Sequence, residues 1–159
     1  MRQHFFDLLF EKMWKNKKVI LLTGDLGYGL VDKIQEVMPE QFINCGASEQ
    51  AMLGIGVGLA LQGYIPVCYS ITPFLLWRGA EWIRNYINAE EIPVKLIGSG
   101  RGLDYAHDGK THWADDDEQL MNLFENIKSF WPVSIENMED VMNAMFTDNK
   151  PYYINLKRG

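Results

Sequence analysis

FINCGASEQAMLGIGVGLALQGYIPVCYS, residues 42–70, is the stretch that decides the fold. Its two ends, residues 42–45 and 65–70, are short apolar runs, and each predicts a strand. Between them Ser48 and Glu49 open a long apolar stretch that predicts a helix. A strand, a helix and a second strand in succession are typical of units repeated around a parallel sheet.

The same alternation continues over the rest of the chain. Further apolar runs predict strands at residues 18–23, 94–98, 127–131 and 152–156. Helix start signals lie at Thr72, which Pro73 follows, and at Ser134. With 159 residues and 47% hydrophobic content, the chain can bury the core of one domain. We expect one α/β domain over residues 1–159, with three α/β/α layers around a mostly parallel six-stranded sheet.

The N-terminal segment predicts an amphipathic helix rather than a targeting signal. Phe5, Leu9 and Met13 follow a spacing of four residues, and the charges of Asp7 and Glu11 interrupt any apolar core of secretory length. No segment approaches the roughly 20 uninterrupted apolar residues that a membrane span requires. We therefore expect a soluble protein.

Charge and cysteine content exclude several classes of partner. The formal net charge is -6, with 21 acidic against 15 basic residues, which leaves no electrostatic footprint for nucleic acid. Cys45 and Cys68 are the only cysteines, and nothing near them has metal-ligand spacing. These features predict a reduced, cytoplasmic protein without an assignable metal ligand.

The helix that begins at Glu49 is apolar on every face, which predicts that it is buried all round. Since a small domain has few places for such a helix, part of its surface is expected to meet another polypeptide, with Gly54 and Gly58 allowing close approach. Ordinary packing within one domain explains these glycines about equally well. Glu49 alone is also explained by the helix dipole, which favours an acid at a helix start.

The glycines give little support to a nucleotide site. A dinucleotide-binding fingerprint lies in the turn between the first strand and the first helix, whereas Gly54, Gly56 and Gly58 lie inside a helical run. The segment TGDLGYG at 23–29 has the better position but lacks the required spacing. A nucleotide-binding protein of flavodoxin-like shape is therefore a weak alternative.

Five segments, in the same order, resemble the pyrimidine domain of transketolases and deoxyxylulose-phosphate synthases. They are TGDLG at 23–27, the stretch 42–67, PFLLWRGAEWIR at 73–84, DGKTH at 108–112 and YYINL at 152–156. Enzymes of this family depend on thiamine diphosphate. The resemblance implies the fold described above and a transferase that moves a two-carbon ketol or acyl unit from a sugar phosphate or keto acid.

The resemblance implies roles for four residues on the cofactor side. Glu49 matches the acid that bonds the pyrimidine ring nitrogen and drives the aminopyrimidine to the imino tautomer, which removes the thiazolium proton. A carboxylic acid in an apolar cleft can share its proton with a ring nitrogen, so the burial of Glu49 and this proton sharing require the same environment. Phe74 and Trp77 match aromatic residues that stack on the pyrimidine, although core packing also explains them. Asp25 matches an aspartate beside the thiazolium ring and is otherwise a turn residue.

Three further residues are implied on the substrate side. Asp108 and His112 match an aspartate and a histidine that reach substrate hydroxyls and the oxygen of the intermediate, so His112 is also a catalytic candidate. Arg101 resembles an arginine near the substrate phosphate in deoxyxylulose-phosphate synthases. Transketolases tend to place a histidine one residue earlier, where this chain has Gly100, so the choice of substrate stays open.

The acidic run ADDDEQLM at 114–121 follows this segment. Asp116 and Asp117 match an acidic pattern of the family. A solvated helix start explains both aspartates equally well.

The family anchors the cofactor's diphosphate through a divalent cation, which a G-D-G motif and a later asparagine hold in a different domain. This chain has Gly24-Asp25-Leu26 in place of that motif. The resemblance therefore implies that thiamine diphosphate is shared with a separate diphosphate-domain subunit, which also binds the Mg²⁺. We expect a homodimer or a heterotetramer, because sites of the family form where two subunits face each other.

Two functions remain in view from the sequence. The first is the pyrimidine-domain subunit of a split transketolase-like enzyme. The alternative is a non-catalytic regulatory or binding module with the same fold, against which the retention of Glu49 and His112 argues.

Overall fold

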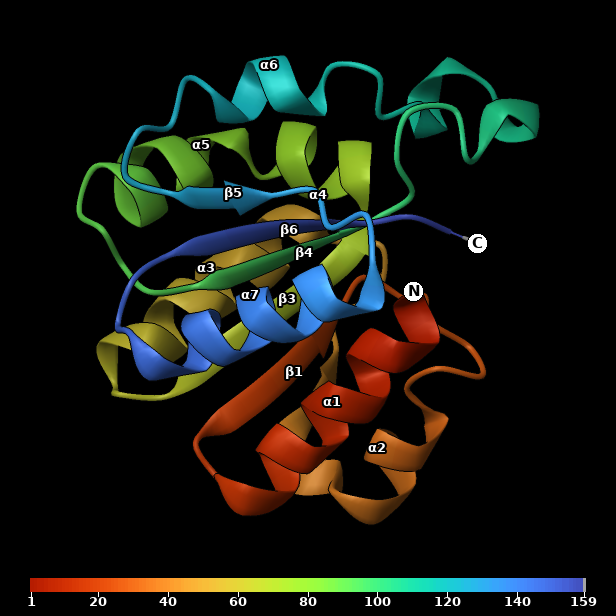
Figure 1. The fold of residues 1–159 in the computed structure, drawn as a ribbon. Helices are drawn as coiled ribbons and strands as arrows, with labels where there is room; N and C mark the ends of the chain where they lie inside the picture. Colours follow the sequence, from red (N-terminus) through yellow and green to blue (C-terminus); the bar gives the residue numbers. More distant parts are fainter. Residues whose placement is uncertain (159) are drawn as a thin grey trace.

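The computed structural model describes residues 1–158 and contains a six-stranded sheet in which neighbouring strands run parallel (Figure 1). The strand order is β2-β1-β3-β4-β6-β5. The strands are β1 (Val19–Thr23), β2 (Phe42–Asn44), β3 (Ile65–Ile71), β4 (Lys95–Ser99), β5 (Lys128–Phe130) and β6 (Tyr152–Leu156). Each end lies within one residue of its predicted position, so the six predicted strands are confirmed.

Helices cover both faces of the sheet and complete the three predicted layers (Figure 1). One face carries α1 (Arg2–Lys15), α2 (Asp32–Val37) and α7 (Ile135–Thr147). The other carries α3 (Glu49–Leu61), α4 (Thr72–Arg78), α5 (Ala80–Trp82), the π-helical turn η2 (Ile83–Asn88) and α6 (Asp117–Met121). Short 3-10 turns are η1 (Pro39–Gln41), η3 (Ala106–Asp108) and η4 (Lys110–His112).

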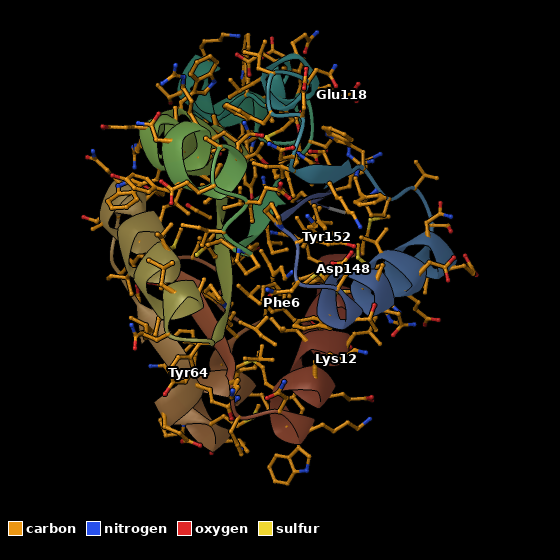
Figure 2. All side chains as sticks on the ribbon, turned by 90° about the vertical axis from the view of Figure 1, so that its left-hand side faces the viewer. Phe6, Lys12, Tyr64, Glu118, Asp148 and Tyr152 are labelled. Carbon is orange, nitrogen blue, oxygen red and sulfur yellow. The ribbon has the colours of Figure 1, made fainter. Side chains whose placement is uncertain are left out.

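The two hydrophobic cores follow from the alternation of side chains along each strand. In β1, Val19 and Leu21 pack in the core beneath α1 and α7, whereas Ile20 and Leu22 pack in the core beneath α3 and α4. Figure 2 shows Phe6 between α1 and the sheet, where its ring meets Tyr69 edge-on at 4.9 Å. Since both faces are covered, the four central strands β1, β3, β4 and β6 are buried along almost their whole length.

The predicted N-terminal amphipathic helix is confirmed. Phe5, Leu9 and Met13 of α1 are fully buried, while Trp14 is 60% exposed at its outer side. Within residues 1–158, no helix combines the length and the apolar character needed to cross a membrane.

Within this chain α3 is buried on one side only, so its expected contact with another polypeptide stays a prediction. Ile55 is 43% exposed and Leu61 is 67% exposed. Gly54 does serve packing inside the domain, because a Cβ there would lie 2.9 Å from the Trp82 ring. A Cβ on Gly58, in contrast, would meet no atom within 4 Å. One glycine of the pair therefore packs internally and the other lies on an open apolar surface.

The sheet order creates a crevice between the carboxyl ends of β1 and β3. The chain leaves β1 towards β2 at one edge of the sheet, and it leaves β3 towards β4 in the opposite direction. The two connections therefore diverge, which is where open α/β sheets bind ligands. Gly24 and Ser70 mark the two sides of this crevice, joined by the hydrogen bond from Gly24 N to the Tyr69 carbonyl at 3.0 Å.

A buried lysine of the sheet makes stability depend on pH. Lys95 is 2% exposed and donates to the Lys150 carbonyl, and burial lowers the pKa of Lys95 to about 8. Between that pH and the ordinary lysine value the unfolded chain holds the proton and the folded chain does not, so this residue's contribution to stability rises with pH. We expect Lys95→Met to be more stable than the wild type by about 1–3 kcal/mol at pH 7. Urea unfolding at several pH values checks this, since the advantage must shrink between pH 8 and 10; a constant difference would contradict it.

Candidate functional site

A buried carboxylate lies in the crevice between β1 and β3. Glu49 is the first residue of α3 and is 1% exposed. Its Oε1 accepts a hydrogen bond from Ser70 Oγ at 2.8 Å, and its Oε2 accepts one from Arg78 Nη1 at 2.7 Å. The start of a helix favours a negative charge, and the two donors satisfy one oxygen each.

Gly24 packs directly against Glu49 in the crevice. A Cβ on residue 24 would lie 2.8 Å from Ser70 Oγ and 3.0 Å from Glu49 Oε1. Such distances would force Ser70 and Glu49 to shift, so glycine is the residue that the end of β1 accommodates without displacement. The TGDLG segment thus contributes Gly24, whose lack of a side chain leaves room for Glu49, as well as Asp25.

Helix α4 supplies the aromatic and cationic side of the site. Phe74 and Arg78 lie one turn apart on α4, and the Arg78 Cζ atom lies 4.0 Å from the centroid of the Phe74 ring. The guanidinium therefore lies against the Phe74 ring while it donates to Glu49. Trp77 is 53% exposed beside them.

Two hollows meet at Arg78. The first measures about 440 Å³ and lies over the start of α3, lined by Ala47, Ser48, Glu49, Gln50, Ala51 and Arg78. The second measures about 430 Å³ and lies between α4 and the segment 110–116, with Phe74, Trp77, Lys110 and Trp113 in its walls. The side chain of Arg78 borders both.

His112 joins the group through Phe74. The two rings meet edge-on with centroids 4.7 Å apart, and His112 Nδ1 lies 3.0 Å from Thr111 Oγ1. Arg78 thus links Glu49 to Phe74, and Phe74 in turn contacts His112, so three residues singled out in the sequence lie in one chain of contacts.

Three other predicted site residues make their contacts elsewhere. Asp25, in the left-handed region with φ 58°, accepts hydrogen bonds from Asn44 Nδ2 at 3.0 Å and Tyr28 Oη at 3.3 Å. Asp108 pairs with His107 on the exposed loop at 3.2 Å.

Arg101, the third, is tied to the backbone of the core. It donates to Asn155 Oδ1 at 3.1 Å, to the Asn155 carbonyl at 2.7 Å and to the Pro132 carbonyl at 3.1 Å. Burial lowers the pKa of Arg101. Its role towards a substrate phosphate stays a prediction.

A buried polar network lies behind the site. Asp117 is 4% exposed, and its Oδ2 accepts hydrogen bonds at 2.8 Å from Trp131 Nε1, Tyr153 Oη and Asn155 Nδ2. Asn155 also reaches Thr72 Oγ1, at the start of α4, and the Gly100 carbonyl. Burial, and then the Asp117 charge, raise the pKa of Tyr153 well above its ordinary value, so this phenol stays a donor. A solvated helix start is therefore the wrong explanation for Asp117.

Sequence reasoning missed Ser70 and Arg78. Ser70 lies near the end of a predicted strand and carries no pattern of its own. Arg78 had a usable signal, because it follows Phe74 by four residues in a predicted helix and therefore shares its face. Its contact with Glu49, 29 positions away, needs the fold.

The family model described as "Transketolase, pyrimidine binding domain" matches residues 1–159. Among curated proteins, the 6-deoxy-6-sulfo-D-fructose transketolase subunit SqwH of Clostridium sp. (strain MSTE9) is 28% identical over 159 residues, covering 99% of this chain and 49% of that protein. A subunit of the apulose-4-phosphate transketolase of Actinobacillus succinogenes is 32% identical over 118 residues, covering 74% of this chain and 38% of that protein. The chain thus spans about half or less of the length of these relatives.

Solved structures match over the whole fold. A split gene transketolase, described as an inactive beta4 tetramer, superposes with a TM-score of 0.86 at 28% identity, covering 99% of this chain and 50% of that one. The transketolase from Leishmania mexicana superposes with a TM-score of 0.85 at 18% identity, covering 99% of this chain and 25% of that one, and supports the fold alone. The predicted α/β/α fold is confirmed.

The contact of Gly24 with Glu49 predicts the effect of adding a methyl group. Gly24→Ala should lower the free energy of unfolding by about 1–3 kcal/mol, because Ser70 and Glu49 must move apart. Gly58→Ala is the matched control, since its Cβ would meet no atom within 4 Å and alanine favours a helix. Urea unfolding of both variants checks the pair, and equal stabilities would contradict the packing described here.

The network around Asp117 predicts a large loss on its removal. Asp117→Ala should cost about 2–4 kcal/mol, because three buried donors lose their acceptor. Asp115→Ala is the control, since Asp115 pairs with Lys110 at the exposed surface, and it should change stability little. Thermal unfolding of both variants measures the difference; similar losses would contradict a special role of Asp117.

Proposed function

Because the chain belongs to the family of transketolase pyrimidine-binding domains, we propose that it is the pyrimidine-domain subunit of a split transketolase-like enzyme. In this proposal it activates thiamine diphosphate for transfer of a two-carbon ketol or acyl unit. The observation that carries the proposal is the buried Glu49 carboxylate in the crevice between β1 and β3, with the Phe74 ring close by.

The residues present fit the aminopyrimidine of that cofactor. Glu49 and Phe74 already accommodate one flat group with N–H donors, the guanidinium of Arg78. An aminopyrimidine is likewise flat and bonds through nitrogen at its edge, so a carboxylate and an aromatic face suit it. When bound, thiamine diphosphate supplies the acidic thiazolium carbon to which the two-carbon unit attaches.

The side chains of this chain would then have separate roles towards the cofactor and the substrate. Glu49 would share a proton with the pyrimidine ring nitrogen, from a buried position that Ser70 fixes. Phe74 and Trp77 would stack on the ring, and Asp25, at the same edge of the sheet, would face the thiazolium side. His112, against Phe74, and Asp108, in the same loop, are the proposed contacts to substrate hydroxyls, with Arg101 for a phosphate.

The other half of the site is proposed to come from a separate chain. Relatives named as transketolase subunits and as a transketolase C-terminal section support a division of the enzyme into parts. Within residues 1–158, no group of three or more His, Cys, Asp or Glu side chains is placed to hold a metal ion. We assign the Mg²⁺ and the diphosphate to that partner, in a homodimer or heterotetramer that acts on a sugar phosphate or keto acid in the cytoplasm.

Glu49→Gln tests the proposal in the assembled enzyme. A candidate diphosphate-domain chain is mixed with this chain, and thiamine diphosphate with Mg²⁺ is titrated calorimetrically into the mixture and into this chain alone. We expect tight binding in the mixture only. Exchange of the thiazolium proton with deuterium, followed by NMR, should slow by about 10²–10⁴-fold in Glu49→Gln, because the proton relay is lost.

Glu81→Gln is the matched control, since Glu81 is an exposed acid of α5 outside the crevice. It should leave both binding and exchange unchanged. Unchanged exchange in Glu49→Gln would remove Glu49 from the mechanism. Binding in the mixture without exchange in the wild type would favour the regulatory module instead.

A further inference from the structure

We propose that the guanidinium of Arg78 occupies the pyrimidine site in the free chain, so that the cofactor must displace it to bind. This inference rests on the proposed function, because it concerns the same site. It assigns Arg78 the role of an internal competitor that controls access to Glu49.

The position of the guanidinium carries this inference. Its Nη1 donates to Glu49 Oε2 at 2.7 Å, and its Cζ lies 4.0 Å from the centroid of the Phe74 ring. These are the hydrogen-bonding edge and the stacking face that the proposed function gives to the aminopyrimidine. Two flat groups cannot lie on the same face of the Phe74 ring at once, so the guanidinium must leave before an aminopyrimidine can stack there and bond to Glu49.

The contact is also one that the side chain can leave. Arg78 is the last residue of α4, its side chain is 46% exposed, and within residues 1–158 its one ion pair is with Glu49. Arg78 also lines the second hollow, and the walls of that hollow include Trp77 and Asp116, so the guanidinium has a neighbouring space that it can enter. The hydrogen bond from Ser70 to Glu49 Oε1 does not involve Arg78, so it can hold the carboxylate in position when the guanidinium leaves.

As a competitor, Arg78 lowers the apparent affinity for the pyrimidine without changing the affinity of the open site. The apparent dissociation constant is the intrinsic one divided by the fraction of molecules in which the site is open. A charge-assisted hydrogen bond and a cation–π contact on a half-exposed side chain together favour the closed form. We expect an open fraction of about 3–30%, so removal of Arg78 should raise affinity by about 3–30-fold.

The test uses 4-amino-5-hydroxymethyl-2-methylpyrimidine, the isolated pyrimidine half of the cofactor, titrated into the chain and followed by amide NMR shifts. Arg78→Met, which keeps length but loses the planar donor, should bind it about 3–30-fold more tightly than the wild type. Arg84→Met is the matched control, because Arg84 bonds to its neighbour Asn85 and lies outside the site. Its affinity should equal that of the wild type. Equal or weaker binding by Arg78→Met overturns the inference.

A measurement on the unaltered protein guards against misfolding of the variant. In the free wild type the side-chain nitrogen signals of Arg78 should show slowed rotation of the guanidinium, and saturating pyrimidine should restore fast rotation. Unchanged Arg78 signals in the saturated protein would overturn displacement. If neither the wild type nor Arg78→Met binds the pyrimidine while the assembled enzyme still binds thiamine diphosphate with Mg²⁺, this inference fails and the proposed function stands. If the assembled enzyme does not bind thiamine diphosphate either, both fail.

Discussion

The burial of one carboxylate, that of Glu49, is the constraint around which the site is built. A carboxylate loses its hydration when it is 1% exposed, and it stays buried only where donors replace the lost water. Here the replacements come from the ends of two elements, Ser70 of β3 and Arg78 of α4, with the start of α3 adding its dipole. Gly24 leaves the space that this arrangement needs. Four elements must therefore take their places before the acid can be buried.

The buried polar network explains how α4 and the loop after β4 are held for this purpose. Thr72, at the start of α4, donates to the Gly100 carbonyl at the end of β4, and Asn155 of β6 donates to both. Asp117 then holds Asn155 from the side of α6. Such networks are specific because an unsatisfied member is costly in a low-dielectric interior. The aromatic face of Phe74 is thus fixed relative to Glu49 by hydrogen bonds that never touch the proposed ligand.

The sequence allowed the fold to be predicted almost completely, because both faces of this sheet are buried. The central strands are therefore mostly apolar runs, and the predicted ends of all six strands lie within one residue of the observed ends. Glu49, Phe74 and His112 came from a resemblance, and the structure brings them together. Arg78 and Asp117 were missed or misinterpreted because their side chains act on partners 29 and 38 positions away. Charge patterns cannot distinguish a solvated aspartate from one that accepts three buried hydrogen bonds.

A pyrimidine subunit that needs a partner chain, as we propose, has a physical problem that a complete enzyme does not have. A buried environment allows an acid to bond to a ring nitrogen. The same environment keeps water away from that acid when the ring is absent. The chain meets this with a group that resembles the ligand, and arginine suits this better than lysine. Its guanidinium is planar, so it can stack on Phe74 and donate at its edge, as an aminopyrimidine does, whereas an ammonium could satisfy the charge but not the ring face. A free subunit of this design keeps its acid buried and hydrogen-bonded. Access to that acid then depends on Arg78, which only a better-fitting flat ligand displaces.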